Sequence, residues 1–217
     1  NDNLATNRLI EQWLPEHIPI DDPDASLQQP LTPDWGNLEA FSFLDPAALR
    51  PDGPEPFLLL DADQASLDLP SGLLHLSGPV SLKSSTDEHG LLLDAGAYEL
   101  RNPSVAAQLI GPVINPDFIR QAQDVVDVQT QLSDHQKLIA EFWEDGSGSS
   151  FPPGTWMAIT AYMAAQSELA LADDIRLNFA VGQALGDAGI AAWDTKYHFN
   201  YARPVRVIRD LASLDFL

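Results

Sequence analysis

The stretch Lys196-Tyr-His-Phe-Asn-Tyr-Ala-Arg203-Pro204 places two cations seven residues apart in a chain of 217 residues. On a helix with about 100° per residue, Trp193 lies at about +60°, Asn200 at about +40° and Arg203 at about −20° from Lys196. An indole, an ammonium, an amide and a guanidinium therefore share one face of the predicted helix. Pro204 disfavours helical backbone at Arg203, which predicts that Arg203 lies at a helix end or kink.

This segment locally reverses the charge of the chain. Asp and Glu number 32 against 11 Lys and Arg, which gives a net charge of −21, yet four cations fall within residues 196–217. Like charges on one face repel, so either acids elsewhere neutralise an ordinary solvated face, or Lys196 and Arg203 bind an anion. A mobile ammonium and a planar guanidinium suit a tetrahedral oxyanion. The spacing leaves both alternatives open.

The composition excludes several functional classes. Binding to nucleic acid or to an anionic membrane surface needs clustered cations, which the strong negative charge argues against. Cysteine is absent, so no disulfide or thiolate metal site can form. No apolar run reaches about 18 residues, so we expect no transmembrane helix. The acidity and the first residue, Asn1 rather than Met, lead us to expect an extracellular or periplasmic protein from which an upstream segment was removed.

Proline density changes near residue 102, and we expect two domains, residues 1–102 and residues 103–217. Eleven of the 17 prolines precede residue 102, and proline both lacks an N–H donor and clashes with the preceding helical turn. For the first domain we expect a short helix over residues 4–14 and an irregular wrap over most of residues 15–56. Two or three short strands are predicted at Phe57–Leu60, Leu73–Leu76 and Leu91–Leu93.

The second domain is predicted to be helical. Ser133 and Gln136 have the spacing of a capping box, and Pro152–Pro153 can begin the following helix. A long helical stretch is predicted from about residue 171 to residue 202. The glycines within it lie four and three residues apart, so they either admit a close neighbouring helix on one side or break the helix; they are Gly182, Gly186 and Gly189.

The form K-x6-R-P resembles the first of three signature motifs of the superfamily of vanadium-dependent haloperoxidases and type 2 phosphatidic acid phosphatases. The preceding Ala192-Trp-Asp-Thr-Lys196 is similar to bacterial haloperoxidase-like members. So are Thr32-Pro-Asp-Trp-Gly36 and Ala140-Glu-Phe-Trp-Glu-Asp-Gly146 followed by Pro152-Pro-Gly-Thr-Trp156. The resemblance covers residues 30–56 and 100–210 and leaves residues 60–95 unmatched.

The resemblance implies a mainly α fold: a helical bundle of the vanadium haloperoxidase/acid phosphatase type, with an irregular Pro-rich N-terminal region and a few short strands. It implies that Lys196 and Arg203 bind the oxygens of vanadate, or of phosphate at the same site, and that Lys196 polarises bound peroxide. Trp193 would line the halide side or simply pack in the core. Asp145 would pair with a second arginine of the pocket or lie solvated at a helix end.

The sequence departs from the family at several positions. Thr155 stands where His often follows Pro-Pro-Gly, and Ala202 stands where Trp often precedes the arginine. The second motif, Ser-Gly-His, and the third, an Arg with a later His, are both missing after Arg203; Pro70-Ser-Gly72 precedes the first motif and continues with Leu73. None of the five histidines lies downstream of Arg203: His17, His75, His89, His135 and His198.

We therefore expect a second polypeptide that carries the missing motifs and packs tightly against residues 120–217. It would cover apolar positions in this region that the chain itself was not expected to bury: Ile190, Phe199, Val205, Ile208 and Leu211.

Three functions follow as hypotheses. The first is the N-terminal part of a haloperoxidase-like enzyme that oxidises halide with hydrogen peroxide at bound vanadate. The second is an acid phosphatase on the same scaffold, and the third is a non-catalytic structural or interaction protein that retains half of the fold. Separately, Asp22-x-Asp24-x-Ser26 and Asp61-x-Asp63 could bind calcium, but both lack the glycine and glutamate of a full loop, and surface turns explain them as well.

Overall fold

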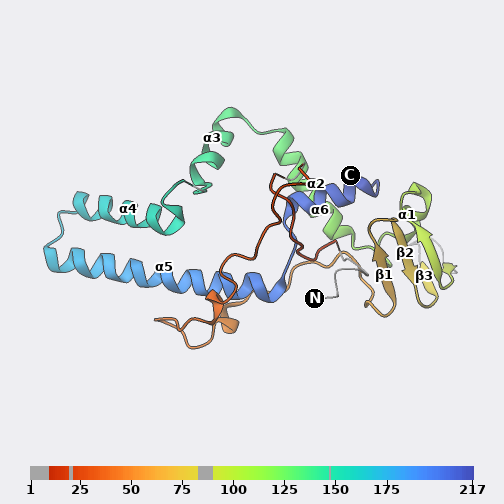
Figure 1. The fold of residues 1–217 in the computed structure, drawn as a ribbon, viewed down its shortest axis with the longest axis horizontal. Coiled ribbons are helices and arrows are strands. Elements are labelled where there is room, and N and C mark those ends of the chain that lie inside the picture. Colours follow the sequence, from red (N-terminus) through yellow and green to blue (C-terminus); the bar gives the residue numbers. More distant parts are fainter. Residues whose placement is uncertain (1–9, 20–21, 83–89, 147) are drawn as a thin grey trace. The chain divides into compact units, whose positions relative to one another are not determined.

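A computed structural model describes residues 10–19, 22–82, 90–146 and 148–217 (Figure 1). The chain divides into two compact units. The first, called the sheet unit below, comprises Asn1–Glu16, Gly53–Gln131 and Asn200–Leu217. The second, called the long-helix unit, comprises His17–Asp52 and Leu132–Phe199.

Five short strands occur among the described residues, all in the sheet unit: β1 (Ala65–Asp68), β2 (Leu73–Leu76), β3 (Val80–Leu82), β4 (Leu91–Leu93) and β5 (Gly96–Glu99). β1, β2 and β5 form an antiparallel sheet in that order, with Leu73 opposite Asp68 on one side and Glu99 on the other. β3 and β4 form a separate antiparallel pair. The predictions for β2 and β4 are confirmed, and β1, β3 and β5 were not predicted.

The predicted strand at residues 57–60 is wrong. Leu58 forms only an isolated bridge to Ile114. The Leu59 N–H donates to the Val113 carbonyl at 2.7 Å, and the Asn115 N–H donates to the Phe57 carbonyl at 2.8 Å. The backbone groups of this segment are therefore used by the turn that precedes a helix rather than by another strand.

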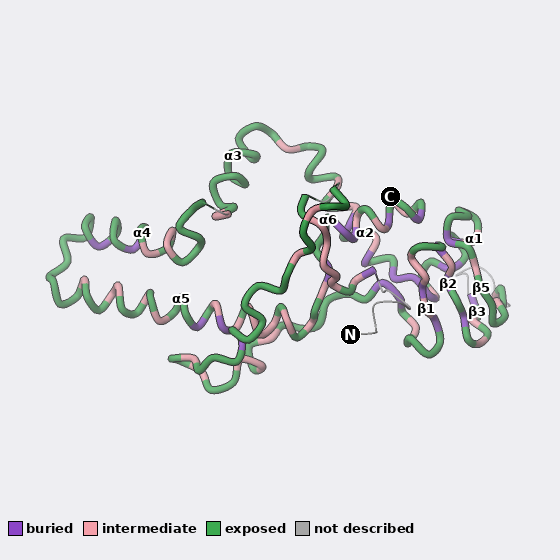
Figure 2. Tube along the Cα trace, viewed as in Figure 1, coloured by how far each residue is buried: buried purple, intermediate pink, exposed green. Residues whose placement is uncertain are grey.

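Three helices complete the sheet unit: α1 (Pro103–Leu109), α2 (Pro116–Thr130) and α6 (Pro204–Ser213). Asn102 and Asn115 cap α1 and α2 with their side chains, and a proline begins each helix. Phe57 is fully buried and contacts the rings of Phe118 and Phe216 edge-on. Burial in this unit is concentrated along β1, β2 and the helices that cover them (Figure 2).

The helix predicted over residues 4–14 is wrong in its described part, residues 10–14, which form a turn and a bridge; residues 4–9 lie outside the described residues. Gln12 bridges to Tyr201. The Trp13 N–H donates to the Asn200 carbonyl and the Ala202 N–H to the Glu11 carbonyl. Because these groups bond to a distant segment, they cannot form the i to i−4 bonds of a helix.

The long-helix unit contains α3 (Asp134–Trp143), α4 (Phe151–Gln166) and α5 (Leu171–Phe199). The capping box of Ser133 and Gln136 is confirmed, and two prolines lie in the first turn of α4 as predicted. α5 runs unbroken through its glycines, which decides between the two alternatives (Figure 1). The side chains nearest to Gly186 and Gly189 are Phe41 and Trp35, so an N-terminal segment, and not another α-helix, approaches them.

That segment, residues 31–50, is called the strap below. It contains two short 3-10 helices, η2 (Trp35–Asn37) and η3 (Pro46–Leu49), and both pack on α5. Residues 31–50, which are part of the expected irregular wrap, therefore lie on α5.

Two glycine substitutions are expected to change stability in opposite directions. A Cβ at Gly36 would lie 2.7 Å from the backbone N and Cα of Asp194, so Gly36→Ala should destabilise the chain by about 1–3 kcal/mol through overpacking. Gly182 has no neighbour within 4 Å, so Gly182→Ala should stabilise α5 by about 1 kcal/mol. Urea unfolding measures the change in the free energy of unfolding for both variants. Changes of the same sign would contradict the packing described for the strap.

The mainly α fold with short strands is confirmed, while the haloperoxidase type of bundle stays a prediction. Helices begin at Pro103, where the proline density falls, but the division into domains at residue 102 also stays a prediction. In the described part of the chain, no helix is both long and apolar enough to cross a membrane.

Candidate functional site

Lys196 lies in α5, and Arg203 directly precedes α6. α5 ends at Phe199, because Asn200 adopts a left-handed backbone with φ +46°, a conformation that Asn tolerates better than most residues. Arg203 is the extended N-cap residue of α6, directly before Pro204. The prediction of a helix end at Arg203 is confirmed. The helical angles that placed Lys196 and Arg203 on one face do not apply, since one helix does not connect them.

The cations around this junction differ in their partners. Arg206 is buried, forms an ion pair with Asp210 and donates to the Gln12 carbonyl. Arg209 pairs with Glu16. Among the ion pairs of the described residues, none involves Arg203, whose side chain is exposed. Neutralisation by nearby acids therefore accounts for Arg206 and Arg209 but not for Arg203.

Trp193 lies beneath the Lys196 ammonium, whose Nζ is 5.1 Å from the centroid of the indole. This distance is typical of a cation–π interaction. The indole N–H donates to Thr32 Oγ1 at 2.8 Å and to the Leu31 carbonyl at 3.1 Å. The ring of Trp35 meets Trp193 edge-on, with centroids 5.1 Å apart. Trp193 is thus held by the strap on one side and contacts Lys196 on the other.

Asp194 joins α5 to the other end of the strap. Arg50 donates to its carboxylate twice, from Nε at 2.5 Å and from a terminal nitrogen at 2.8 Å. This hydrogen bonding holds the pKa of Asp194 below its ordinary value. A planar guanidinium fixes the direction of a carboxylate as well as its distance. The residue next to Trp193 is therefore restrained independently of the indole.

Asp187 makes a third link between α5 and the strap. Its carboxylate accepts from the backbone N–H groups of Phe41 and Ser42 at 2.7 and 2.9 Å, and from the Ser42 hydroxyl at 2.5 Å. These bonds, the hydroxyl's first, lower the pKa of Asp187. The sequence showed no signal for this contact, because its partners lie more than 140 residues apart.

These lowered pKa values predict a pH dependence of stability. A carboxylate whose folded pKa lies below its unfolded value stabilises the fold above the unfolded value, about 4, and loses this contribution as the pH falls through the folded value. The free energy of unfolding should therefore decline below about pH 4. In Asp187→Asn and Asp194→Asn the decline should be shallower, as measured by urea unfolding from pH 6 to pH 2.5. Parallel curves for wild type and both variants would contradict this assignment.

Asp145 lies between α3 and α4 with a left-handed φ of +44°. Its carboxylate accepts a hydrogen bond at 2.7 Å from Thr155, the residue that departs from the His of the family. Thr155 thus orients Asp145 in this chain. The pairing of Asp145 with a second arginine stays a prediction.

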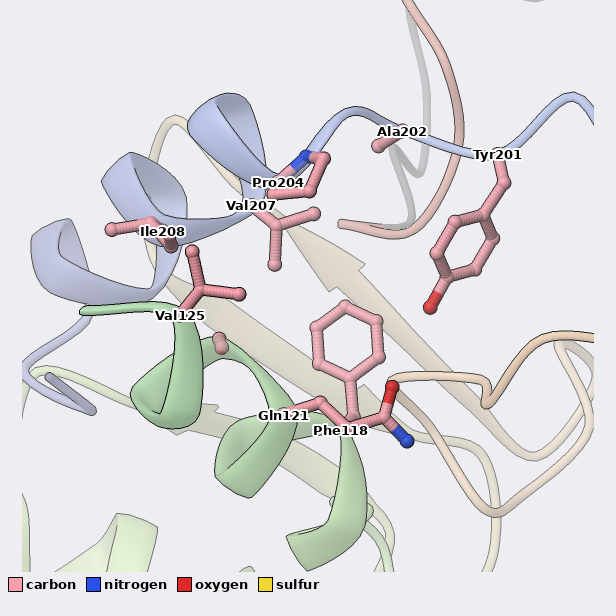
Figure 3. Close-up of a pocket in the computed structure, with 9 residues that line it drawn as sticks. Phe118, Gln121, Val125, Tyr201, Ala202, Pro204, Val207 and Ile208 are labelled. Atoms are coloured by element: carbon pink, nitrogen blue, oxygen red, sulfur yellow. The ribbon is translucent and has the colours of Figure 1, made fainter. Parts of the chain in front are cut away.

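An apolar pocket of about 130 Å³ lies beside Arg203 in the sheet unit, between α2 and α6 (Figure 3). Phe118, Ala202 and Val207 form much of its wall. The Tyr201 hydroxyl donates to the Glu55 carbonyl at 2.6 Å, and burial raises the pKa of Tyr201 to about 12. This pocket is suited to an apolar side chain and not to an oxyanion.

The calcium hypothesis gains no support. Within the described ranges, no group of three or more His, Asp or Glu side chains gathers in a way that could hold a metal ion. Asp22 instead accepts from the Asp24 backbone N–H, as in a surface turn.

Several of these contacts were not predicted as part of the site. Thr32 and Gly36 belong to a stretch that resembles the family. The sequence did not predict that this stretch contacts Trp193 and Asp194. Arg50 and Asp187 showed no signal in the sequence. Trp193 was predicted to line a halide site or to pack; it packs against the strap.

The family comparison points to the same segment. The model of the VCPO second helical-bundle domain matches residues 176–215, which include most of α5 and all of α6. No curated protein and no solved structure matches the chain significantly. The match contains Trp193, Lys196 and Arg203 and agrees with the K-x6-R-P resemblance. Over residues 176–215, a small part of the chain, this match supports a relationship to the vanadium haloperoxidase family.

Proposed function

We propose that this chain supplies the Lys196 and Arg203 part of the oxyanion site in a vanadium-dependent haloperoxidase-like enzyme. The observation that carries the proposal is the family match over residues 176–215, which contains K-x6-R-P within α5, the junction and α6. Halide oxidation by this protein is part of the proposal.

The residues present fit an oxyanion. Lys196 is exposed at the last turn of α5, and Arg203 is exposed ahead of the first turn of α6. Lys196 would donate up to three N–H bonds as a point charge, and Arg203 would donate two parallel bonds from its planar guanidinium. No acid among the described residues forms an ion pair with Arg203. Its positive charge can therefore be balanced by a bound anion.

Vanadate, when bound, supplies the Lewis-acidic centre at which peroxide becomes reactive toward halide. Lys196 would hold positive charge near an oxygen where negative charge develops, which would stabilise the transition state. Arg203 would balance the charge of the anion in a chain whose net charge is −21. Trp193 would cover one side of the ammonium.

The remaining groups of the pocket, Ser-Gly-His and a later Arg and His, we assign to a segment outside residues 1–217, on the same chain or on a second polypeptide. The sequence of residues 1–217 contains no Ser-Gly-His. α4 is apolar around its whole circumference, yet Trp156, Tyr162 and Met163 are exposed. A helix of this composition is normally covered on all sides. Val205 and the pocket beside Arg203 offer a further apolar surface on α6.

Two of the apolar positions that were expected to need a partner do not need one. Ile190 and Leu211 are 5% and 0% exposed within this chain. Residues of the same chain bury them, which the sequence could not reveal without the fold.

The complete enzyme, with vanadate and hydrogen peroxide, should brominate a phenol-red-type dye, and Lys196→Ala should abolish most of this activity. Hydrolysis of an aryl phosphate without bromination would instead identify the acid phosphatase. Absence of both activities and of vanadate binding would favour the structural protein. Intact-mass measurement under denaturing conditions should show whether the missing motifs lie on the same chain or on a second polypeptide.

A further inference from the structure

We propose that the strap, residues 31–50, positions the Lys196 ammonium for anion binding, with Trp193 as the positioning residue and Thr32 as the residue that fixes the indole. The inference rests on the proposed function of Lys196 and adds the part of the chain that sets its geometry. It joins an N-terminal segment to a signature motif more than 140 residues later.

The backbone of Thr32 is the first observation. Thr32 has a φ of +44°, although β-branched residues rarely adopt left-handed backbone. Such outliers persist where surrounding contacts determine them, and they are found near functional sites. Here the strained residue directs its hydroxyl to the indole N–H of Trp193 at 2.8 Å. The conformation of Thr32 is thus linked to the orientation of one ring.

The second observation is that contacts fix the ring of Trp193 in several directions. The indole N–H is shared between Thr32 and the Leu31 carbonyl, and Trp35 packs edge-on with an interplanar angle of 87°. Because these contacts fix the ring, its face stays in one orientation. The Lys196 ammonium therefore takes its position from the ring.

The third observation is that the strap is fastened to α5 on both sides of this contact. Arg50 pairs with Asp194, one residue beyond Trp193, and Asp187 binds the strap backbone about two turns earlier. These anchors restrain the strap without touching Lys196. A long lysine side chain loses rotamer freedom when it binds an anion. An ammonium already held over a fixed ring loses less of it, so the strap should raise anion affinity.

The chain has three lysines, Lys83, Lys137 and Lys196, so each can be followed separately after ¹³C-dimethylation, which keeps the charge. Ring current should shift the Lys196 methyl signal upfield in the wild type, with Lys137 as an internal reference. Trp193→Leu and Thr32→Val should move the signal toward that of free dimethyl-lysine. Thr32→Ser should restore it, because serine keeps the hydroxyl.

Two controls separate positioning from folding. Thr160→Val makes the same chemical change at a buried threonine of α4, and Tyr197→Phe removes the other side-chain donor to Leu31 without touching the indole. Both should leave the Lys196 signal unchanged. A wild-type signal that Trp193→Leu does not move would overturn the proposal.

In the complete enzyme, Thr32→Val should weaken vanadate binding about two- to fivefold, the size of an exposed cation–π contribution, and Thr32→Ser should restore it. Equal affinity in wild type and Thr32→Val would also overturn the proposal. If the ring-current shift is present but vanadate does not perturb the Lys196 signal, the proposed function fails and the positioning role with it. If vanadate binds at Lys196 but the shift is absent, only the strap proposal fails.

Discussion

Replacing Lys196 by alanine in the complete enzyme is expected to weaken vanadate binding about ten- to a hundredfold. The change removes a charge-assisted hydrogen bond, which contributes about 1.5–3 kcal/mol, and each 1.4 kcal/mol corresponds to about tenfold in affinity. Equilibrium dialysis or ⁵¹V NMR titration measures the dissociation constant. Phosphate affinity should fall in parallel, because both are tetrahedral oxyanions.

Lys137→Ala is the matched control for this prediction. Lys137 is exposed on α3 and pairs with Asp134 at 3.4 Å. Its removal changes the net charge by the same amount, so a general effect of charge in a chain of −21 would appear in both variants. A loss confined to Lys196→Ala identifies a local contact. Unchanged affinity for vanadate and phosphate would remove Lys196 from the site.

Several of the helices after residue 103 could be predicted from the sequence because their signals are local. Ser133 and Gln136 lie three residues apart and form the capping box that their spacing predicts. Pro204 restricts only the residue before it, and Arg203 is accordingly extended. Such rules need no knowledge of the rest of the chain.

The strands and the strap could be predicted only in part because their partners are distant. β1 and β5 become strands by pairing with β2, and alternation over four residues gives little warning of this. The segment at residues 57–60 has the composition of a strand but bonds to residues 113–115. Likewise, the glycine spacing in α5 allowed a neighbouring segment to approach closely. Only the structure identifies Trp35 and Phe41 as the side chains that do so.

The candidate site shows the same division. The motif predicts Lys196 and Arg203 as site residues, and the structure places Lys196 in α5 and Arg203 directly before α6. Trp193 was recognised by its place three residues before Lys196, and Thr32 by resemblance alone. Their hydrogen bond depends on a left-handed Thr32, which no sequence rule would predict for a β-branched residue.

Phe57→Ala is expected to destabilise the chain by about 3–5 kcal/mol, the usual cost of removing a buried aromatic ring. Phe57 is fully buried in the sheet unit and contacts both Phe118 on α2 and Phe216 beyond α6. The cavity cannot close easily, because the Phe57 backbone is itself bonded to Asn115. Through Phe216, the Phe57 ring therefore helps to hold α6, the helix that begins directly after Arg203.

Phe179→Ala on α5 is the matched comparison, since Phe179 is 65% exposed in this chain. In the chain alone it should change the free energy of unfolding by less than about 0.5 kcal/mol, as is usual for surface positions. In the complete enzyme the cost should rise to several times that value if a second polypeptide covers the apolar side chains of α4 and α5. Urea unfolding of both variants, with and without the partner, measures the difference. An unchanged cost for Phe179→Ala in the complete enzyme would show that the partner leaves this part of α5 in water, and the apolar circumference of α4 would then need another explanation.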